Sequence, residues 1–425
     1  MKLVELNEKE FIEFSKNFKD SLFYQSPQWI EVKKQNNWTG KIVGFKEKNK
    51  IIAATVLLFK NIKIINKNMV YAPRGFLLDY DNLNLLTEFV ENIKEYLKKE
   101  NALFLKINPY VKYQERDIDG NIIPDTRKDT LFNKLKELGF NHQGFYIRMD
   151  DKKDLEPRWL SVLNLENKTA DDIYKNLRTT TRWRINTSEK KCLSIIECKR
   201  EDLKEFKALM QHTADRREFI DRPLSYYENL YDVLAKDDLV KVLLVEINFK
   251  ELLTKTKKEL EEILINIEEI KDNTKKQGKL NELNKEKEAH EKQIIDLKEY
   301  IEKYGNTKII AGGLYMLYGR QLVYLLGASY KEFMKYNSQY LLQWKMINYA
   351  IDNNYQTFNF YGIDGDFSKE SKNYGLFDFK RGFGCEVVEL IGEFDLAINK
   401  PMYILYKIAF KTYKLIKNLK NGIKK

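Results

Sequence analysis

The sequence predicts an α+β protein made of two copies of one structural unit, with an antiparallel helical hairpin inserted into the second copy. Three observations lead to this fold class. The chain has 425 residues, too many for one ordinary hydrophobic core. A helix, then a strand, then a short helix ending in Gly-Phe occurs twice along it. A highly charged segment, residues 250–304, lies between these two occurrences.

The repeated pattern sets the domain boundaries. Periodicity predicts a helix over 85–99 and a strand over 102–108 in the first copy, and a helix over 339–353 and a strand over 356–363 in the second. Antiparallel strands precede each pair. The predicted division is residues 1–152 for the first unit, 153–249 and 305–399 for the second, 250–304 for the hairpin, and 400–425 for a C-terminal helix.

Residues 250–304 predict a coiled-coil arm of two helices. They contain 13 Lys and 14 Asp or Glu, and Gly278 marks a turn near the midpoint. The flanking runs 241–247 and 307–329 are rich in β-branched and aromatic residues, so the arm is expected to interrupt a β-hairpin. The predicted seam consists of Leu253, Leu260, Ile263, Ile267 and Ile270 in the first helix and Leu280, Leu283, Ile294, Leu297, Ile301 and Tyr304 in the second.

Most of the net charge of +11 lies at the C-terminus. Residues 400–425 hold eight Lys and no acidic residue, so the other 399 residues carry only about +3. Lys407, Lys411 and Lys414 follow the spacing of one helix face, and apolar residues cover the rest, which predicts a basic amphipathic helix. Two interpretations stay open: peripheral contact with an anionic membrane, or docking of the apolar side on the protein body.

Composition points to the cytoplasm. The most apolar stretch, residues 51–59, is far shorter than the roughly 20 residues that span a bilayer, and the N-terminus shows no apolar signal core. Cys192, Cys198 and Cys385 are odd in number and unclustered, so we expect buried thiols of a reducing compartment and no metal site.

Common catalytic motifs are missing, which leaves Arg, Lys and Tyr chemistry. The sequence has no G-x-x-x-x-G-K-[ST], H-E-x-x-H or G-x-S-x-G and only three His. Residues 212–231 place Arg216, Arg217 and Arg222 beside Tyr226, and guanidinium groups bind phosphate bidentately, so this segment predicts a diphosphate site. The alternative is a surface cluster neutralised by Asp215, Glu218 and Asp221.

A second basic segment, residues 176–186, carries Arg178, Arg182 and Arg184 around Trp183. Basic and aromatic side chains together suit a nucleic acid backbone or a phosphate. We interpret these three arginines as candidate nucleic acid or phosphate contacts.

Three further cations are weaker candidates. Lys33 lies near two Trp, Arg74 occupies a Pro-Gly turn, and Lys380 lies among three Phe in residues 377–384. Desolvation there can lower the pKa of Lys380 or direct its ammonium at a developing oxyanion. The ordinary interpretation of each is packing plus a solvated charge.

Six segments in order resemble the Fem family (FemA, FemB and FemX types) of peptidoglycan-bridge aminoacyltransferases. They are QSPQWIEVK, YAPRG, RREFIDRPLSYYENL, YGRQLVYLLGAS, YLLQWKMINYAIDNNYQTFNFYGI and LFDFKRGFGCEVVELIGEFD. The resemblance implies two tandem acetyltransferase-like (GNAT) units with a coiled-coil arm in the second. It also implies aminoacyl transfer from charged tRNA to an amine of the precursor stem peptide, without a cofactor, a metal or DNA.

The resemblance carries specific residues. Lys33, Arg222 and Tyr226 match positions that hold the diphosphate and the nucleotide or lipid-linked end of the precursor, and Phe379 with Lys380 matches the motif beside the transfer centre. The full candidate set is Lys380 and Phe379 as catalytic residues, Lys33, Arg74, Arg216, Arg222, Tyr226 and Tyr324 as substrate-binding residues, and Arg178, Arg182 and Arg184 as tRNA or phosphate contacts.

The chain departs from the family pattern at three positions. Asn108 stands where some relatives have Asp, which leaves no carboxylate base there, and Leu326 and Ile220 replace an aromatic and a Thr. These changes favour lipid II over UDP-MurNAc-pentapeptide as the acceptor.

Two alternatives to transfer from tRNA remain. The first is an acyl-CoA-dependent GNAT acyltransferase, which needs a Gly-rich turn to bind the pyrophosphate, but the strand is followed by GASYKEF, which has a single Gly. The second is a non-catalytic scaffold that binds tRNA or membrane.

Overall fold

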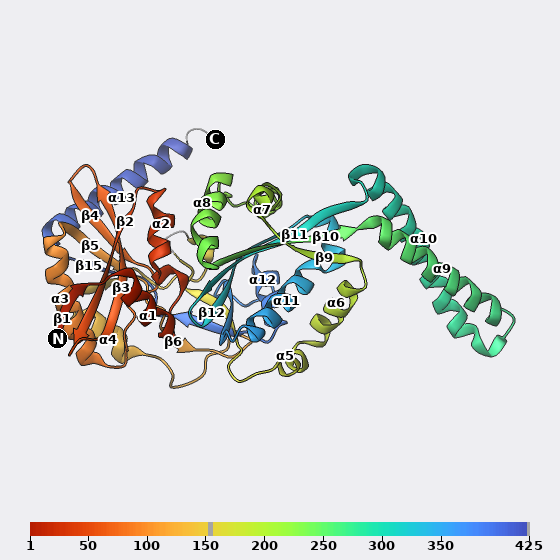
Figure 1. Ribbon diagram of the computed structural model, residues 1–425, viewed down its shortest axis with the longest axis horizontal. Helices are drawn as coiled ribbons and strands as arrows, with labels where there is room; N and C mark the ends of the chain where they lie inside the picture. Colours follow the sequence, from red (N-terminus) through yellow and green to blue (C-terminus); the bar gives the residue numbers. More distant parts are fainter. Residues whose placement is uncertain (152–155, 423–425) are drawn as a thin grey trace.

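The computed structural model describes residues 1–151 and 156–422, with residues 413–422 described through their helical backbone. It contains two α+β units, each built on a mixed sheet, and a helical arm that projects from the second unit (Figure 1). This confirms the predicted fold class of two units with an inserted hairpin.

The first sheet has the order β1-β2-β3-β4-β5-β15-β7. Its strands are β1 (Lys2–Glu5), β2 (Thr39–Glu47), β3 (Lys50–Ile62), β4 (Lys67–Ala72), β5 (Ala102–Ile107), β7 (Phe140–His142) and β15 (Phe394–Ala397). The helices of this unit are α1 (Glu8–Asn17), α2 (Pro27–Lys34), α3 (Leu83–Lys99) and α4 (Asp129–Glu137).

The second sheet has the order β6-β14-β8-β13-β12-β11-β10-β9. Its strands are β6 (Lys112–Glu115), β8 (Trp159–Asn164), β9 (Leu193–Glu197), β10 (Val240–Asn248), β11 (Thr307–Tyr318), β12 (Gln321–Ser329), β13 (Thr357–Gly362) and β14 (Glu386–Leu390). Its helices are α5 (Ala170–Asn176), α6 (Thr179–Glu189), α7 (Leu203–Arg217), α8 (Leu224–Leu234), α11 (Ser338–Asp352) and α12 (Tyr374–Arg381).

The predicted repeat appears in the strand pairing. Helix α3 connects the parallel strands β4 and β5, and α11 connects the parallel strands β12 and β13 in the same way. Helix α3 forms because Leu86, Phe89, Val90 and Ile93 recur at helical spacing and are all buried, and Asn82 caps its N-terminus. Strand β4 of the first unit therefore corresponds to β12 of the second, and β5 corresponds to β13.

The two units exchange strands. Strand β15, from the C-terminal half of the chain, pairs with β5 and β7 in the first sheet, and β6, from the N-terminal half, pairs with β14 in the second. The division at residues 152 and 153 stays a prediction and lies outside the described residues. The exchange means that the units cannot separate without breaking sheet hydrogen bonds.

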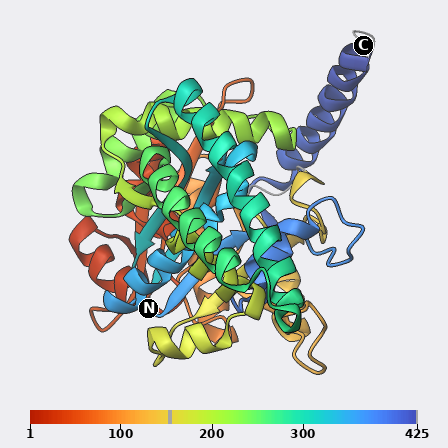
Figure 2. The same ribbon diagram turned by 90° about the vertical axis from the view of Figure 1, so that its right-hand side faces the viewer.

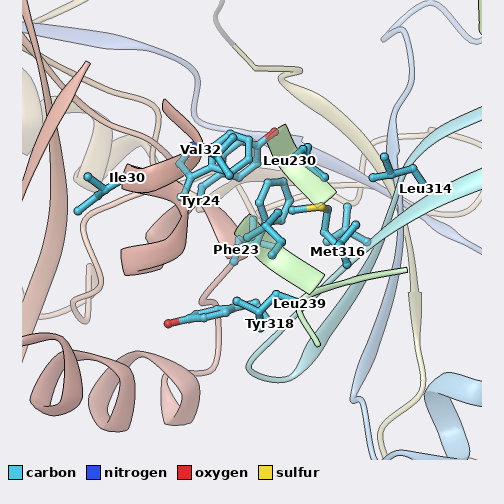
Figure 3. Close-up of a cluster of buried hydrophobic side chains, with 14 of the residues drawn as sticks. Phe23, Tyr24, Ile30, Val32, Leu230, Leu239, Leu314, Met316 and Tyr318 are labelled. Carbon is cyan, nitrogen blue, oxygen red and sulfur yellow. The ribbon is translucent and has the colours of Figure 1, made fainter. Parts of the chain in front are cut away.

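A shared hydrophobic cluster joins the units (Figure 3). The first unit contributes Phe23, Tyr24 and Val32, and the second contributes Leu230 from α8 and Met316 from β11. All of these side chains are buried. Because α2 and α8 are held together by this cluster, Lys33 on α2 comes near the start of α8.

The arm consists of α9 (Phe249–Ile270) and α10 (Gln277–Tyr304) and faces the viewer in Figure 2. It interrupts a β-hairpin as predicted, since Asn248 at the end of β10 pairs with Thr307 at the start of β11. Four predicted seam residues are buried: Ile263, Ile270, Leu283 and Leu297.

Helix α13 (Lys400–Gly422) follows β15 and begins against the first unit. Tyr403 is buried beside Leu103 and Phe104, and its hydroxyl donates to Asp395 Oδ2 at 2.7 Å. Residues 423–425, which belong to the predicted C-terminal helix, lie outside the described residues. Among the helices described, none is both long and apolar enough to cross a bilayer.

Candidate active site

The candidate site lies where the two units meet, at the carboxyl ends of β4 and β13. Arg74 lies two residues after β4 and Tyr361 is the penultimate residue of β13, and both adopt positive φ angles, +54° and +66°. Such backbone is rare for residues other than Gly and gathers at functional sites. The junction of these two strand ends is therefore the first place to look for chemistry.

A carboxylate lies at this junction. Tyr24 donates to Oε2 of Glu156 at 2.6 Å, Tyr361 donates to the same oxygen, and the two hydroxyl oxygens are 2.6 Å apart. Burial, reinforced by the charge of Glu156, raises the pKa of both tyrosines well above 10, so both remain neutral donors. No sequence motif marks Glu156, because its partners come from residues 132 and 205 positions away.

Asn108 organises the turn that carries Arg74. Its Oδ1 accepts from the backbone N–H of Arg74 at 2.9 Å and from the Tyr71 hydroxyl at 3.1 Å. The Arg74 guanidinium, which is buried, donates to the Pro157 carbonyl at 2.7 Å. An amide cannot accept a proton from an amine, so Asn108 positions the turn and is no base.

A group of cations lies on the α2 and α8 side of Glu156. The Lys33 ammonium lies 4.7 Å from the centre of the Trp29 ring, and the Arg222 guanidinium lies 5.5 Å from that of Tyr226. Burial lowers the pKa of Lys33, the charge of Glu156 opposes this, and Arg222 adds to the lowering. Lys33, Arg222 and Tyr226, predicted together from the resemblance, are thus close to one another.

The predicted acidic partners of the arginine cluster are engaged elsewhere. Within the described residues, no carboxylate forms an ion pair with Arg216, Arg217 or Arg222. Asp215 accepts from Gln211, Glu218 pairs with Lys372, and Asp221 pairs with Lys207. Arg216 lies half-buried on α7, with its pKa lowered by burial and by Arg217. This leaves positive charge available for an anion, as a diphosphate site requires.

Lys380 is enclosed on the second-unit side of the junction. It is 3% exposed, and its ammonium donates to the Gly362 carbonyl at 2.6 Å, next to Tyr361. Burial lowers its pKa from 10.5 to about 7, as its apolar setting predicted. Phe379 packs edge-on against Tyr340, with ring centres 4.9 Å apart.

Among the three arginines of α6 and its N-cap, one contacts α12 and one contacts α11. Arg178 pairs with Asp378 at 3.0 Å, and Arg184 donates to the Tyr340 hydroxyl at 2.6 Å. Arg182 instead donates to the Lys175 carbonyl. The structure therefore brings Arg178 next to α12, which carries Phe379 and Lys380, and brings Arg184 next to Tyr340 of α11, whose ring contacts Phe379.

Tyr324 lies apart from the cation group. Its hydroxyl donates to Gln339 Oε1 at 3.0 Å, and its ring packs edge-on against Phe360, 6.2 Å away, which in turn contacts Phe379. The structure places Tyr324 in the aromatic layer of the second unit, beneath Phe379.

A cavity of about 550 Å³ lies between the units, and Arg74 is one of the residues that line it. Asp20, Tyr110, Lys112 and Lys128 contribute to its lining. Burial raises the pKa of Asp20 against the opposing effect of nearby Lys residues. In the part of the chain that is described, no cluster of His, Cys, Asp and Glu side chains is arranged to hold a metal.

The low pKa of Lys380 predicts a pH-dependent stability. Between pH 7 and 10 an unfolded lysine is protonated while the buried Lys380 is largely neutral, so the unfolded state binds more protons and stability rises with pH. Compared with Lys380→Met, the parent should gain about 2 kcal/mol of unfolding free energy between pH 7 and 9. Urea unfolding of both proteins across this range measures the difference. A difference that stays constant with pH would show that Lys380 titrates at its ordinary value.

Comparison with known proteins gives consistent matches over nearly the whole chain. Residues 6–411 match the FemAB family. The chain is 33% identical over 422 residues to aminoacyltransferase FemA of Staphylococcus epidermidis, covering 97% of this chain and 100% of that protein. It is 33% identical over 414 residues to FemA of Staphylococcus aureus strain N315, covering 96% and 97%. The crystal structure of FemX superposes with a TM-score of 0.77 at 29% identity, over 95% of this chain and 99% of that one.

Proposed function

Since the chain belongs to the FemAB family and is an aminoacyltransferase, we propose that it moves an amino acid from aminoacyl-tRNA to an amine of the peptidoglycan precursor stem peptide, with lipid II as the preferred acceptor. The family membership confirms the resemblance inferred from the six segments. The interpeptide bridge of peptidoglycan is the product.

One observation carries this proposal: Lys33 and Arg222, which form no ion pair with the described residues, lie with Tyr226 at the same junction as the enclosed Lys380. The cation group suits the diphosphate that lipid II and UDP-linked precursors share. An aminoacyl ester is already activated, so holding amine and ester together supplies most of the rate and no covalent intermediate is needed. The absence of a nucleophilic triad from the sequence fits this chemistry.

The donor tRNA is assigned to the side of α6 and α12. Arg178 and Arg184 flank Phe379, and their guanidinium groups suit the phosphates of the tRNA acceptor end. Lys380 then acts at the ester, where its amino group donates a hydrogen bond that stabilises the tetrahedral oxyanion. The arm of α9 and α10 is near neutral, which favours a spacer or dimerisation role over strong tRNA binding.

The two alternatives predict different behaviour. An acyl-CoA enzyme needs a Gly-rich turn for the pyrophosphate after β12, but the chain there continues as Ser329 and Tyr330 into a 3-10 helix over Lys331–Tyr336. A scaffold that only binds tRNA or membrane would leave the cation group and Lys380 without effect on turnover.

The deciding experiment mixes the purified protein with a pool of charged tRNA and, in parallel, with lipid II and UDP-MurNAc-pentapeptide. Product masses are read with and without RNase. We expect an RNase-sensitive mass gain on a larger fraction of lipid II than of UDP-MurNAc-pentapeptide. The size of the gain identifies the amino acid. If neither acceptor gains mass while acyl-CoA donors support acylation, the proposal is wrong.

We also propose that α13 holds the enzyme at the inner face of the plasma membrane, where lipid II is available. Ile404, Leu405 and Ile408 share one face of α13 and are 58%, 66% and 59% exposed, whereas the buried Tyr403 is on the face that contacts the body. Figure 2 shows the far end of α13 extending away from the rest of the chain. An exposed apolar face flanked by Lys, with no acidic residue, suits an anionic bilayer.

Vesicle binding tests this location. The parent should bind vesicles of phosphatidylcholine with 30% phosphatidylglycerol, and the triple change of Ile404, Leu405 and Ile408 to Ser should weaken binding at least about tenfold, because apolar burial supplies much of the free energy. Ile64→Ser is the matched control, since Ile64 is 97% exposed but lies between β3 and β4. Co-sedimentation measures the bound fraction. Unchanged binding of the triple variant would assign the contact elsewhere.

A further inference from the structure

Glu156 is a carboxylate at the junction that the proposed function leaves without a role. Both tyrosine hydroxyls donate to Oε2, while Oε1 accepts no hydrogen bond within residues 1–151 and 156–422. The side chain is half-buried, so it remains partly accessible. Asp364, three residues after Tyr361, differs from Glu156 because both of its carboxylate oxygens are occupied. They accept from the Met149 N–H at 2.9 Å and from Asn373 Nδ2 at 2.8 Å, and the side chain is buried.

Glu156 also forms no ion pair with any residue that the structure describes. No Lys or Arg of the described chain has a nitrogen within 4.0 Å of its carboxylate, although its charge acts through space on Lys33 and Arg74. A carboxylate fixed by two neutral donors, with one oxygen unoccupied, is arranged to receive a cationic or N–H donor from outside the protein. Residues 1–151 and 156–422 supply no such donor at Oε1.

The proposed reaction brings such a donor. A primary amine of a lysine-type side chain has a pKa of about 10.4 and is an ammonium at neutral pH, so it must lose a proton before it can attack. Asn108, at the end of β5, cannot take that proton, and its Oδ1 is already occupied by Tyr71 and Arg74. Glu156 lies at the same junction, close enough to act on Arg74.

We propose that Oε1 of Glu156 binds the acceptor amine of the peptidoglycan precursor and takes one proton from it. This inference rests on the proposed function. The amine nitrogen then attacks the ester carbonyl carbon, a C–N bond forms and the C–O bond to tRNA breaks. The second proton of the amine goes to the tRNA oxygen as it leaves, and the proton on Glu156 passes to water. Tyr24 and Tyr361 fix the carboxylate for this step.

Binding measured without turnover tests the contact. Two acceptors are compared by calorimetry: lipid II with a shortened lipid chain, and the same molecule with its acceptor amine acetylated. We expect the parent to bind the free amine at least about tenfold more tightly, because acetylation removes the charge that Glu156 pairs with. Glu156→Gln should bind both forms within about threefold of each other and should lower kcat at least about tenfold. Glu156→Asp, which keeps the charge on a shorter side chain, should retain part of the preference.

Glu13→Gln, an exposed change on α1, is the matched control and should keep the parental preference and rate. Melting temperatures of all variants establish that they fold. The inference is overturned if the parent binds both acceptors equally, or if Glu156→Gln keeps the parental preference. Failure of the parent to bind either acceptor would overturn the proposed function together with this inference. A parent that transfers the amino acid normally but binds the free and the acetylated acceptor equally would overturn the inference alone.

Discussion

Replacing Lys380 by methionine should lower kcat of aminoacyl transfer by at least about 100-fold, a loss on the order of 3 kcal/mol of transition-state stabilisation. Two effects act together. The variant loses the enclosed amino group at the proposed transfer centre, and it loses the hydrogen bond that holds the Gly362 carbonyl next to Tyr361. Methionine fills a similar volume, so the aromatic packing around Phe379 should remain.

The measurement is single-turnover transfer from charged tRNA to lipid II, with the melting temperature taken at pH 7. Lys345→Met provides the control, because Lys345 is exposed on the neighbouring helix α11 and its loss should leave the rate within about twofold. A Lys380→Met protein that melts like the parent and transfers at the parental rate would remove Lys380 from the mechanism.

Arg222→Ala should raise KM for the precursor by roughly 10- to 100-fold while kcat changes little. Charge-assisted hydrogen bonds to phosphate contribute about 1.5–3 kcal/mol, and the diphosphate is bound alike in the ground and transition states. Arg222 has no competing carboxylate within the described residues, because Asp221 is paired with Lys207. Its full charge is therefore available to the precursor.

Steady-state kinetics at saturating charged tRNA separates KM from kcat for this variant. Lys204→Ala is the control: Lys204 is exposed near the start of α7, outside the arginine cluster, and the change should leave KM within about twofold. If instead Arg222→Ala lowered kcat at constant KM, Arg222 would act on the reaction and not on the diphosphate.

Patterns local in sequence were sufficient for much of the architecture. Hydrophobic periodicity over 7 to 25 residues is sufficient to predict the repeated helix and strand of the two units, the arm of α9 and α10, and the C-terminal helix. This periodicity depends only on residues that are close together in the sequence. The seam residues Ile263 and Ile270 follow from the same spacing, and both are buried. Burial lowers the pKa of Lys380, and its position among Phe377, Phe379 and Phe383 in the sequence predicts that burial.

The candidate site could be predicted only in part. Lys33, Arg222 and Tyr226 were assigned together through the resemblance, and the structure brings them together. Tyr324 belongs to the same predicted set, but it lies in the aromatic layer that contacts Phe379. Successive side chains of a strand point to opposite faces of the sheet, and the segment alone does not show which residues of other strands and helices pack on each face.

The sequence by itself determined the two-unit α+β organisation, the inserted arm and the basic amphipathic end, because each depends on the spacing of residues that are neighbours along the chain. Only the tertiary structure decided the exchange of β6 and β15 between sheets, the release of Arg222 from its acidic neighbours, and the role open to Glu156. These depend on contacts between residues more than 130 positions apart or on which of several nearby partners a charge selects, and both are settled by packing in three dimensions.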